Sequence, residues 1–309
     1  VLNGDYSLAE EVTATAGTQF TKELDISAYS NGKISVQFIQ VVDGITCYSD
    51  AKSFTIERPF KLVAKVSDPE GDDNGVGIAK GKIQKPTEAQ FVKSLDIQGV
   101  DVYRSGNDIR LGVKMSALSC SWNPASNLFD HVVFYVFISD GDDSTGCNVH
   151  PKSNYELPGA FGKWDYMFQC NGWGQGYYSS KNADASNLGT ATTPAPNNSP
   201  AVDWSNLKDN VAGIEKYHVL DWSGYSPAED SEWEDKSGMI WFNISAAAMG
   251  YPKDISGYKF YINTWDFDMG SPRGIKAGDA EQYKFGTGEL AVATVPLVCD
   301  ETDEIIVIK

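Results

Sequence analysis

Ten consecutive residues, 68–77, constrain the fold more than any other stretch of this sequence. They hold three glycines and four carboxylates, namely Asp68, Glu70, Asp72 and Asp73. Carboxylates this close repel one another unless a cation or several backbone N–H donors offset their charge. Glycine permits the tight backbone turns that aim several oxygens at one point. Because the stretch follows the alternating apolar run 62–66, we expect a strand that ends in a loop built to hold a cation.

The residue types of this loop suit a hard, oxygen-binding ion, and calcium above all. The loop is not an EF-hand, although its acidic residues copy the first three ligand positions of one. Asp73 stands where that loop needs its glycine, and Ala79 stands where it needs a bidentate Glu. A solvated acidic turn in an acidic protein is the alternative that the residues alone leave open.

The charge balance of the chain limits its partners. Lys and Arg number 25 against 42 Asp and Glu, so the formal net charge is −17. Such a surface repels phosphate backbones, which argues against a nucleic-acid partner. No apolar run approaches the roughly 20 residues that a membrane-spanning helix needs. The chain starts at Val, shows no signal peptide and ends directly after the strand-like run 305–309, so we expect an excised piece of a longer protein.

The five cysteines show neither a CxxC motif nor a paired zinc spacing. They are Cys47, Cys120, Cys147, Cys170 and Cys299. One or two disulfides are expected if the chain is secreted or displayed on a cell surface, because that compartment is oxidising. Cys147 and Cys170 bracket a segment rich in glycine and aromatic residues, so they are the first candidate pair. Scattered unpaired cysteines are the alternative.

The apolar pattern predicts an all-β chain, since helical periodicity is almost absent and turn signals are frequent. Residues 131–139 are mostly β-branched or aromatic and predict a central strand. Residues 100–104 and 109–115 flank a Ser-Gly-Asn-Asp turn and predict a hairpin. Residues 141–200 are rich in Gly, Asn, Ser and Pro and read as a long loop-like insertion, of a length that is usually functional. Many short strands of this kind indicate an antiparallel sandwich.

The N-terminal part carries a moderately specific repeat signature. Leu24-Asp25-Ile26-Ser27, Asn31-Gly32 and the strand-like residues 33–36 resemble the second half of the Ig-like repeats of large bacterial surface proteins. The resemblance implies a partial Ig-like spacer over residues 1–58. Glu57-Arg58-Pro59 is the expected linker, and residues 59–309 form the expected second domain.

Four motifs in the second domain resemble the DOMON-like C-terminal module of glucodextranase. The first is the acidic stretch 68–77, and the second is Lys85-Pro86-Thr87 with the following residues 94–97. The third is the core strand that ends at Asp140, and the fourth is Trp265-Asp266 with Arg273 and residues 285–288. The chain departs from the family pattern at Val76 and Lys85, and its insertion is longer and richer in aromatic residues.

This resemblance implies a jelly-roll-like β-sandwich, similar to the carbohydrate-binding modules of family 9, with calcium buried in the opening loop. The resemblance to the family implies that the calcium ligands are Asp68, Asp72 and Asp73. Glu70 and Asp266 are further candidates. The ion is expected to be structural, because it would tie the opening loop to a distant strand and stabilise the fold by linkage.

Residues 164–178 interleave aromatic and planar polar side chains, as sugar-binding sites do. The candidate sugar contacts are Trp164, Trp173, Tyr177, Tyr178 and Gln175. The alternative is that Trp164, Tyr166 and Phe168 form one face of a core strand.

The sequence therefore predicts a non-catalytic, calcium-stabilised carbohydrate-binding module of a larger secreted or surface protein. Its partner is expected to be a polysaccharide or oligosaccharide, with an α-glucan as one candidate. The first alternative is a structural or adhesin module without a sugar site. The second is a domain with its own glycosidase-type carboxylate pair, for which residues 229–235 form the densest late acidic cluster. No motif for a serine nucleophile, a zinc protease or a phosphate loop is present.

Overall fold

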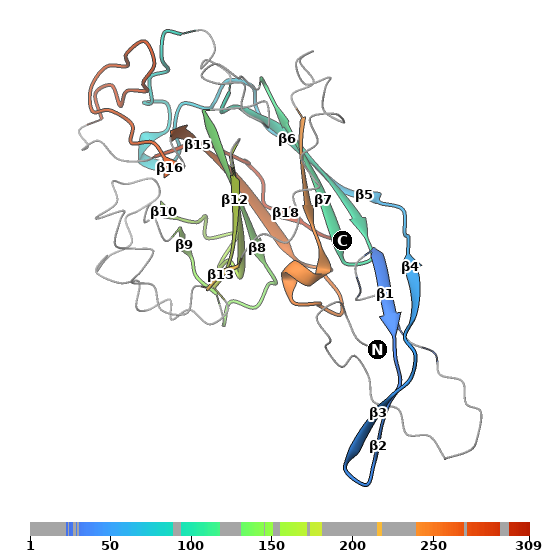
Figure 1. The fold of residues 1–309 in the computed structure, drawn as a ribbon. Helices are drawn as coiled ribbons and strands as arrows, with labels where there is room; N and C mark the ends of the chain where they lie inside the picture. The colour runs from blue at the N-terminus through green and yellow to red at the C-terminus, as the bar shows by residue number, and fades with distance from the viewer. Residues whose placement is uncertain are drawn as a thin grey trace. The chain divides into compact units, whose positions relative to one another are not determined.

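A computed structural model describes most of the chain (Figure 1). The described residues are 23, 25–26, 29, 31–88, 94–117, 131–144, 146–150, 155–171, 174–180, 215–217, 239–268, 271–290 and 297–309. Strands make up 49% of the structure and helices only 3%, and the strands pair in antiparallel sheets, which confirms the predicted all-β sandwich class. Within them, no helix is long and apolar enough to cross a membrane.

The chain divides into two compact units, and the first comprises residues 1–61, 104–109 and 244–254. In its described part, β1 (Gly32–Val36) pairs with β4 (Lys52–Ile56), and β2 (Ile39–Val42) pairs with β3 (Ile45–Tyr48). The β2–β3 turn has positive φ at both Asp43 and Gly44, as a two-residue hairpin turn requires. This unit also holds the 3₁₀ helix η4 (Ala246–Met249). Only part of the Ig-like signature falls on described residues, so the Ig-like assignment stays a prediction.

The second unit comprises residues 62–103, 110–243 and 255–309 and contains two sheets. The larger sheet has eight strands, in the order β13 (Glu215–Tyr217), β12 (Gly174–Ser179), β11 (Tyr166–Asn171), β8 (Val132–Ser139), β15 (Lys259–Asp268) and β16 (Ser271–Pro272), with β17 (Val298–Glu301) and β18 (Ile306–Val307) also paired to β15. The smaller sheet has the order β14 (Met239–Ile244), β7 (Asp108–Met115), β6 (Ile97–Ser105) and β5 (Lys61–Ser67). The pair β9 (Val149–His150) and β10 (Tyr155–Glu156) and the 3₁₀ helix η1 (Gly77–Ala79) complete the described elements.

The two sheets pack face to face through aromatic side chains. The Phe242 ring on β14 contacts Phe134 on β8 and Phe168 on β11, with ring centroids 5.6 and 5.8 Å apart. Strand β8 lies between β11 and β15, and all eight of its residues are buried. The prediction of a central strand at 131–139 is therefore confirmed, as is the β6–β7 hairpin.

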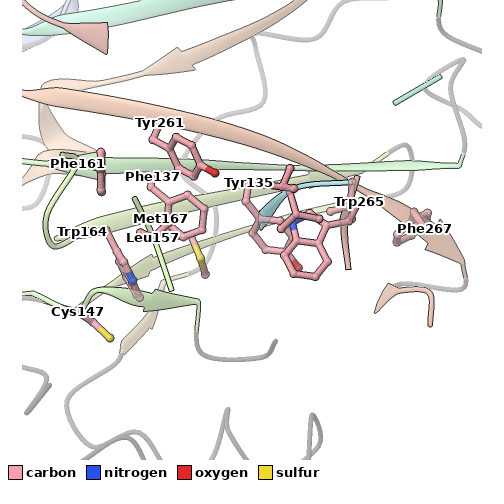
Figure 2. Close-up of a cluster of buried hydrophobic side chains, with 13 residues drawn as sticks. Tyr135, Phe137, Cys147, Leu157, Phe161, Trp164, Met167, Tyr261, Trp265 and Phe267 are labelled. Carbon is pink, nitrogen blue, oxygen red and sulfur yellow. The ribbon is translucent and has the colours of Figure 1, made fainter. Parts of the chain in front are cut away.

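The other face of the eight-stranded sheet is also covered. Alternate residues of β8 and β15, among them Phe137 and Tyr261, pack there against Phe161 and Trp164, which lie in the segment that follows β8 (Figure 2). A sheet that is buried on both faces needs apolar residues at consecutive positions, which explains the unbroken apolar run of β8.

The predicted loop character of residues 141–200 is wrong for the short strands β9 and β10 and for two longer segments. Residues 166–171 form β11, which pairs with β8, and residues 174–179 form β12, which pairs with β11. Tyr166, Met167 and Phe168 are buried in β11. The polar side chain of Gln169 in the same strand is buried as well.

The structure does not contain the predicted disulfide between Cys147 and Cys170, and both cysteines carry free, buried thiols. Cys170 lies directly opposite Phe134, whose ring faces the smaller sheet. Cys147 belongs to the cluster on the opposite face of the larger sheet (Figure 2). Residues directly opposite each other in an antiparallel pair share a face, so the larger sheet separates the two sulfurs.

Candidate metal centre

The acidic loop follows β5, as the sequence predicts, and its backbone is fixed from both sides. The N–H of Asp68 donates to the carbonyl of Gln98 on β6 at 3.2 Å, and the N–H of Gly75 donates to the carbonyl of Cys299 on β17 at 2.9 Å. The N–H of Asp303 donates to Asp68 Oδ1 at 2.8 Å. The loop is therefore held against β17, more than 200 residues further along the chain.

Three carboxylates converge at this place. One oxygen each from Asp68, Asp72 and Asp300 lies within 4.8 Å of the others. Asp300 is on β17 and is 2 % exposed, while Asp68 is 9 % exposed. Beside them lies a small recess lined by Asp72, Gly75, Val76, Lys80, Asp300, Glu301 and Asp303.

The hydrogen bonds of these carboxylates leave two buried oxygens unsatisfied. Asp300 accepts from the N–H of Ile97 at 2.7 Å and from the N–H of Glu301 at 2.9 Å. Asp68 Oδ2 and Asp72 Oδ1 are buried without a hydrogen-bond partner. Buried acceptors are normally satisfied, and each unsatisfied one costs free energy. Two such oxygens within a three-carboxylate cluster suit a hard cation chemically.

The pKa values of the three carboxyls follow from the same burial. The pKa of Asp300 is raised to about 9 and that of Asp68 to about 7, with burial as the largest cause and the neighbouring carboxylates as further causes. Burial is also the largest cause of the raised pKa of Asp72. Hydrogen bonds from backbone N–H groups act in the opposite direction but do not outweigh the burial. Without a cation, this raised pKa therefore keeps the carboxyl of Asp300 mostly protonated at neutral pH.

Two of the predicted ligands have cationic partners of their own. Lys85 forms a hydrogen-bonded ion pair with the fully buried Asp73. Arg273 binds Asp266 in a bidentate manner, with Nε 2.5 Å from Oδ2 and Nη2 3.0 Å from Oδ1. Glu70 is exposed and is not part of the three-carboxylate cluster.

Asp300 was not among the predicted ligands. Its neighbourhood did carry a signal, because Asp300, Glu301, Asp303 and Glu304 follow directly on an apolar stretch. This is the same strand-then-carboxylates pattern that marks the opening loop.

The predicted sugar contacts are spread over different environments. Trp164 is fully buried and packs edge-on against Phe137, so its position does not support a role in ligand contact. Trp173 lies outside the described residues, as do residues 229–235. The backbones of Gln175, Tyr177 and Tyr178 lie in β12, opposite residues of β11.

Two glycines in the acidic loop allow a matched test of its backbone. Gly71 has φ +87° with no atom within 4 Å of a built Cβ, whereas at Gly75, with φ +111°, that Cβ would lie 2.2 Å from the Ala79 carbonyl oxygen. Gly71→Ala is expected to cost about 1–2 kcal/mol, the usual penalty of a left-handed residue. Gly75→Ala is expected to cost clearly more, because backbone atoms must move. Equal costs in urea-induced unfolding would contradict this loop geometry.

The fold and the site together define a β-sandwich module with a carboxylate centre where its two sheets meet. Residues 63–303 match the family described as the C-terminal binding-module, SLH-like, of glucodextranase. Because the match covers most of the 309 residues, the chain belongs to this family. The glucodextranase part of the resemblance is thus confirmed, while the DOMON-like assignment stays a prediction. A search of curated proteins finds no match.

Proposed function

We propose that the chain is a non-catalytic carbohydrate-binding module of a larger secreted or cell-surface protein that acts on glycans. The observation that carries this proposal is the match of residues 63–303 to a family described as a binding module of glucodextranase. The glycan is a polysaccharide or an oligosaccharide, and the family's name makes an α-glucan the first to try. The other domains of the parent protein supply any catalysis.

Calcium is the second part of the proposal. Asp68, Asp72 and Asp300 hold the ion, and the two unsatisfied oxygens of Asp68 and Asp72 are the observation that favours it. Calcium takes six to eight oxygen ligands and accepts carboxylates together with water. The ion joins the end of β5 to β17, two strands that belong to different sheets of the sandwich. Its role is therefore structural, since it stabilises only the folded arrangement of the three carboxylates.

Native gel electrophoresis in the presence of polysaccharides tests the binding function. The chain is expected to migrate more slowly in gels that contain a bound glycan than in gels without one, with bovine serum albumin as the non-binding reference. The panel includes soluble starch, dextran and a set of acidic and neutral plant and bacterial polysaccharides. A parallel reducing-sugar assay is expected to show no hydrolysis.

Each outcome of this experiment decides between the candidate functions. If no glycan in the panel slows the migration of the chain, the result would favour a purely structural surface module. Release of reducing sugar would replace the proposal with an enzyme.

A further inference from the structure

The smaller sheet of the second unit presents one face away from the sandwich core. In β14, Ile240 and Phe242 are buried, and Phe242 contacts the larger sheet. Successive side chains in a strand point to opposite faces, so Met239 and Trp241 point outward. The same alternation directs Asp101 and Tyr103 of β6, Arg110 and Lys114 of β7, and Lys65 of β5 outward. We call this surface the outer face.

The charge of the outer face is opposite to that of the whole chain. Among the described strand residues of the second unit, its charged side chains are Lys65, Asp101, Arg110 and Lys114, which gives three cations for one carboxylate. Asp101 is already paired with Lys65, whose Nζ lies 3.1 Å from Oδ1. In a chain with a net charge of −17, this local excess of cations favours an anionic ligand.

Two aromatic side chains, Trp241 and Tyr103, lie beside these cations. The rings of Trp241 and Tyr103 lie 5.8 Å apart at an angle of 53°, although they come from β14 and β6, which flank β7. They meet across Gly112 on β7, where a built Cβ would lie 2.7 Å from the Trp241 ring. Glycine at this position therefore allows the indole to reach over β7.

Arg110 stacks on one of these two aromatic side chains, Trp241. Its guanidinium carbon lies 4.4 Å from the centroid of the Trp241 ring. A guanidinium stacked on an aromatic ring keeps its N–H donors in its own plane. Since Arg110 Nε is buried, a ligand carboxylate would be met by the terminal Nη groups. Trp241 and Tyr103 supply apolar ring surface of the kind that packs against a pyranose. Adjacent side chains can thus contact both a sugar ring and an acidic group on that ring.

We propose that the outer face binds a carboxylate-bearing polysaccharide, with the sugar ring against Tyr103 and Trp241 and the carboxylate at Arg110 and Lys114. This inference rests on the proposed carbohydrate-binding function and narrows the class of glycan to acidic ones. It also assigns the contact to residues outside the aromatic segment 164–178.

The test combines a glycan array with calorimetric titration of the strongest binder on the array. The array carries uronate-containing oligosaccharides, such as glucuronoxylan fragments, beside the same backbones without the uronate. The full chain is expected to bind the uronate-containing members, and increasing salt is expected to weaken binding. Arg110→Gln and Trp241→Ala are each expected to weaken it about tenfold or more, as loss of a charge-assisted or stacked contact does.

Two exposed side chains outside the outer face serve as matched controls, and Tyr283→Ala and Lys284→Gln are expected to bind like the parent chain. Circular dichroism checks the fold of every variant. If Trp241→Ala fails to fold, the decision rests on Arg110→Gln, which leaves the buried face of β7 intact.

The outcomes separate this inference from the function on which it rests. Binding to neutral glycans alone overturns the acidic ligand and leaves the carbohydrate-binding function standing. Binding to acidic glycans that neither variant weakens overturns the outer face as the site. Binding to no glycan overturns both proposals.

Discussion

Replacing Arg273 by alanine is expected to destabilise the protein by about 3–5 kcal/mol, because it leaves a buried carboxylate without its cation. Asp266 is 1 % exposed, and both of its carboxylate oxygens accept from the Arg273 guanidinium. The free energy of unfolding is measured by urea titration of parent and variant. A second variant, Asp266→Asn with Arg273→Ala, is expected to recover part of the loss, since it removes the buried charge.

An exposed ion pair provides the control for this experiment. Lys276 Nζ lies 2.6 Å from Glu281 Oε1, and both side chains are more than 40 % exposed. Lys276→Ala is therefore expected to change the stability far less than Arg273→Ala, because exposed ion pairs contribute little. Similar losses for Arg273→Ala and Lys276→Ala would contradict the buried, bidentate geometry at Asp266.

Removing calcium is expected to have the second largest effect on stability. At a free calcium concentration of about 100 times Kd, linkage adds about 2.7 kcal/mol to the folded state. For a domain of this size, that corresponds to a decrease in Tm of roughly 5–10 °C when a chelator is added. Differential scanning calorimetry with calcium and with EDTA measures the difference. Magnesium serves as the control cation, since it binds all-protein carboxylate sites less readily.

The calcium effect is expected to grow with pH. Asp68 and Asp300 have pKa values raised to about 7 and about 9 in the metal-free fold, with burial as the largest cause. A raised pKa stabilises the folded state fully below the unfolded value near pH 4, and this contribution is lost as pH rises through the folded values. The chelated protein should therefore be less stable at pH 8 than at pH 5, while calcium binding tightens as the carboxyls lose their protons. If the increase in Tm that calcium produces is smaller at pH 8 than at pH 5, the result would contradict this assignment.

The sequence predicted the sandwich well where local pattern alone decides the structure. The apolar run 131–139 became β8, and the Ser-Gly-Asn-Asp turn closed the β6–β7 hairpin. For residues 166–171 the sequence left two interpretations open, a binding loop and one face of a core strand, and the structure agrees with the second for Tyr166 and Phe168. Their place in β11 depends on pairing with β8, a long-range contact that composition does not reveal.

The cluster of Asp68, Asp72 and Asp300 shows the same limit. Asp68 and Asp72 could be identified because their loop is continuous in sequence. Asp300 could not be assigned, since it reaches them only through the pairing of β17 with β15. Asp73 resembles its neighbours in the loop, but its proximity to Lys85 is a property of the folded chain. The loop sequence therefore identified two members of the three-carboxylate cluster but not the third.

Calorimetric titration of the chelated protein with calcium decides whether carboxylates from the opening loop and from β17 jointly hold one structural ion. We predict one calcium ion per chain, binding that is abolished in Asp300→Asn, and unchanged binding in Glu304→Gln, which removes an exposed carboxylate from the turn after β17. Absence of stoichiometric binding to the parent chain, or unchanged binding in Asp300→Asn, would contradict this shared site.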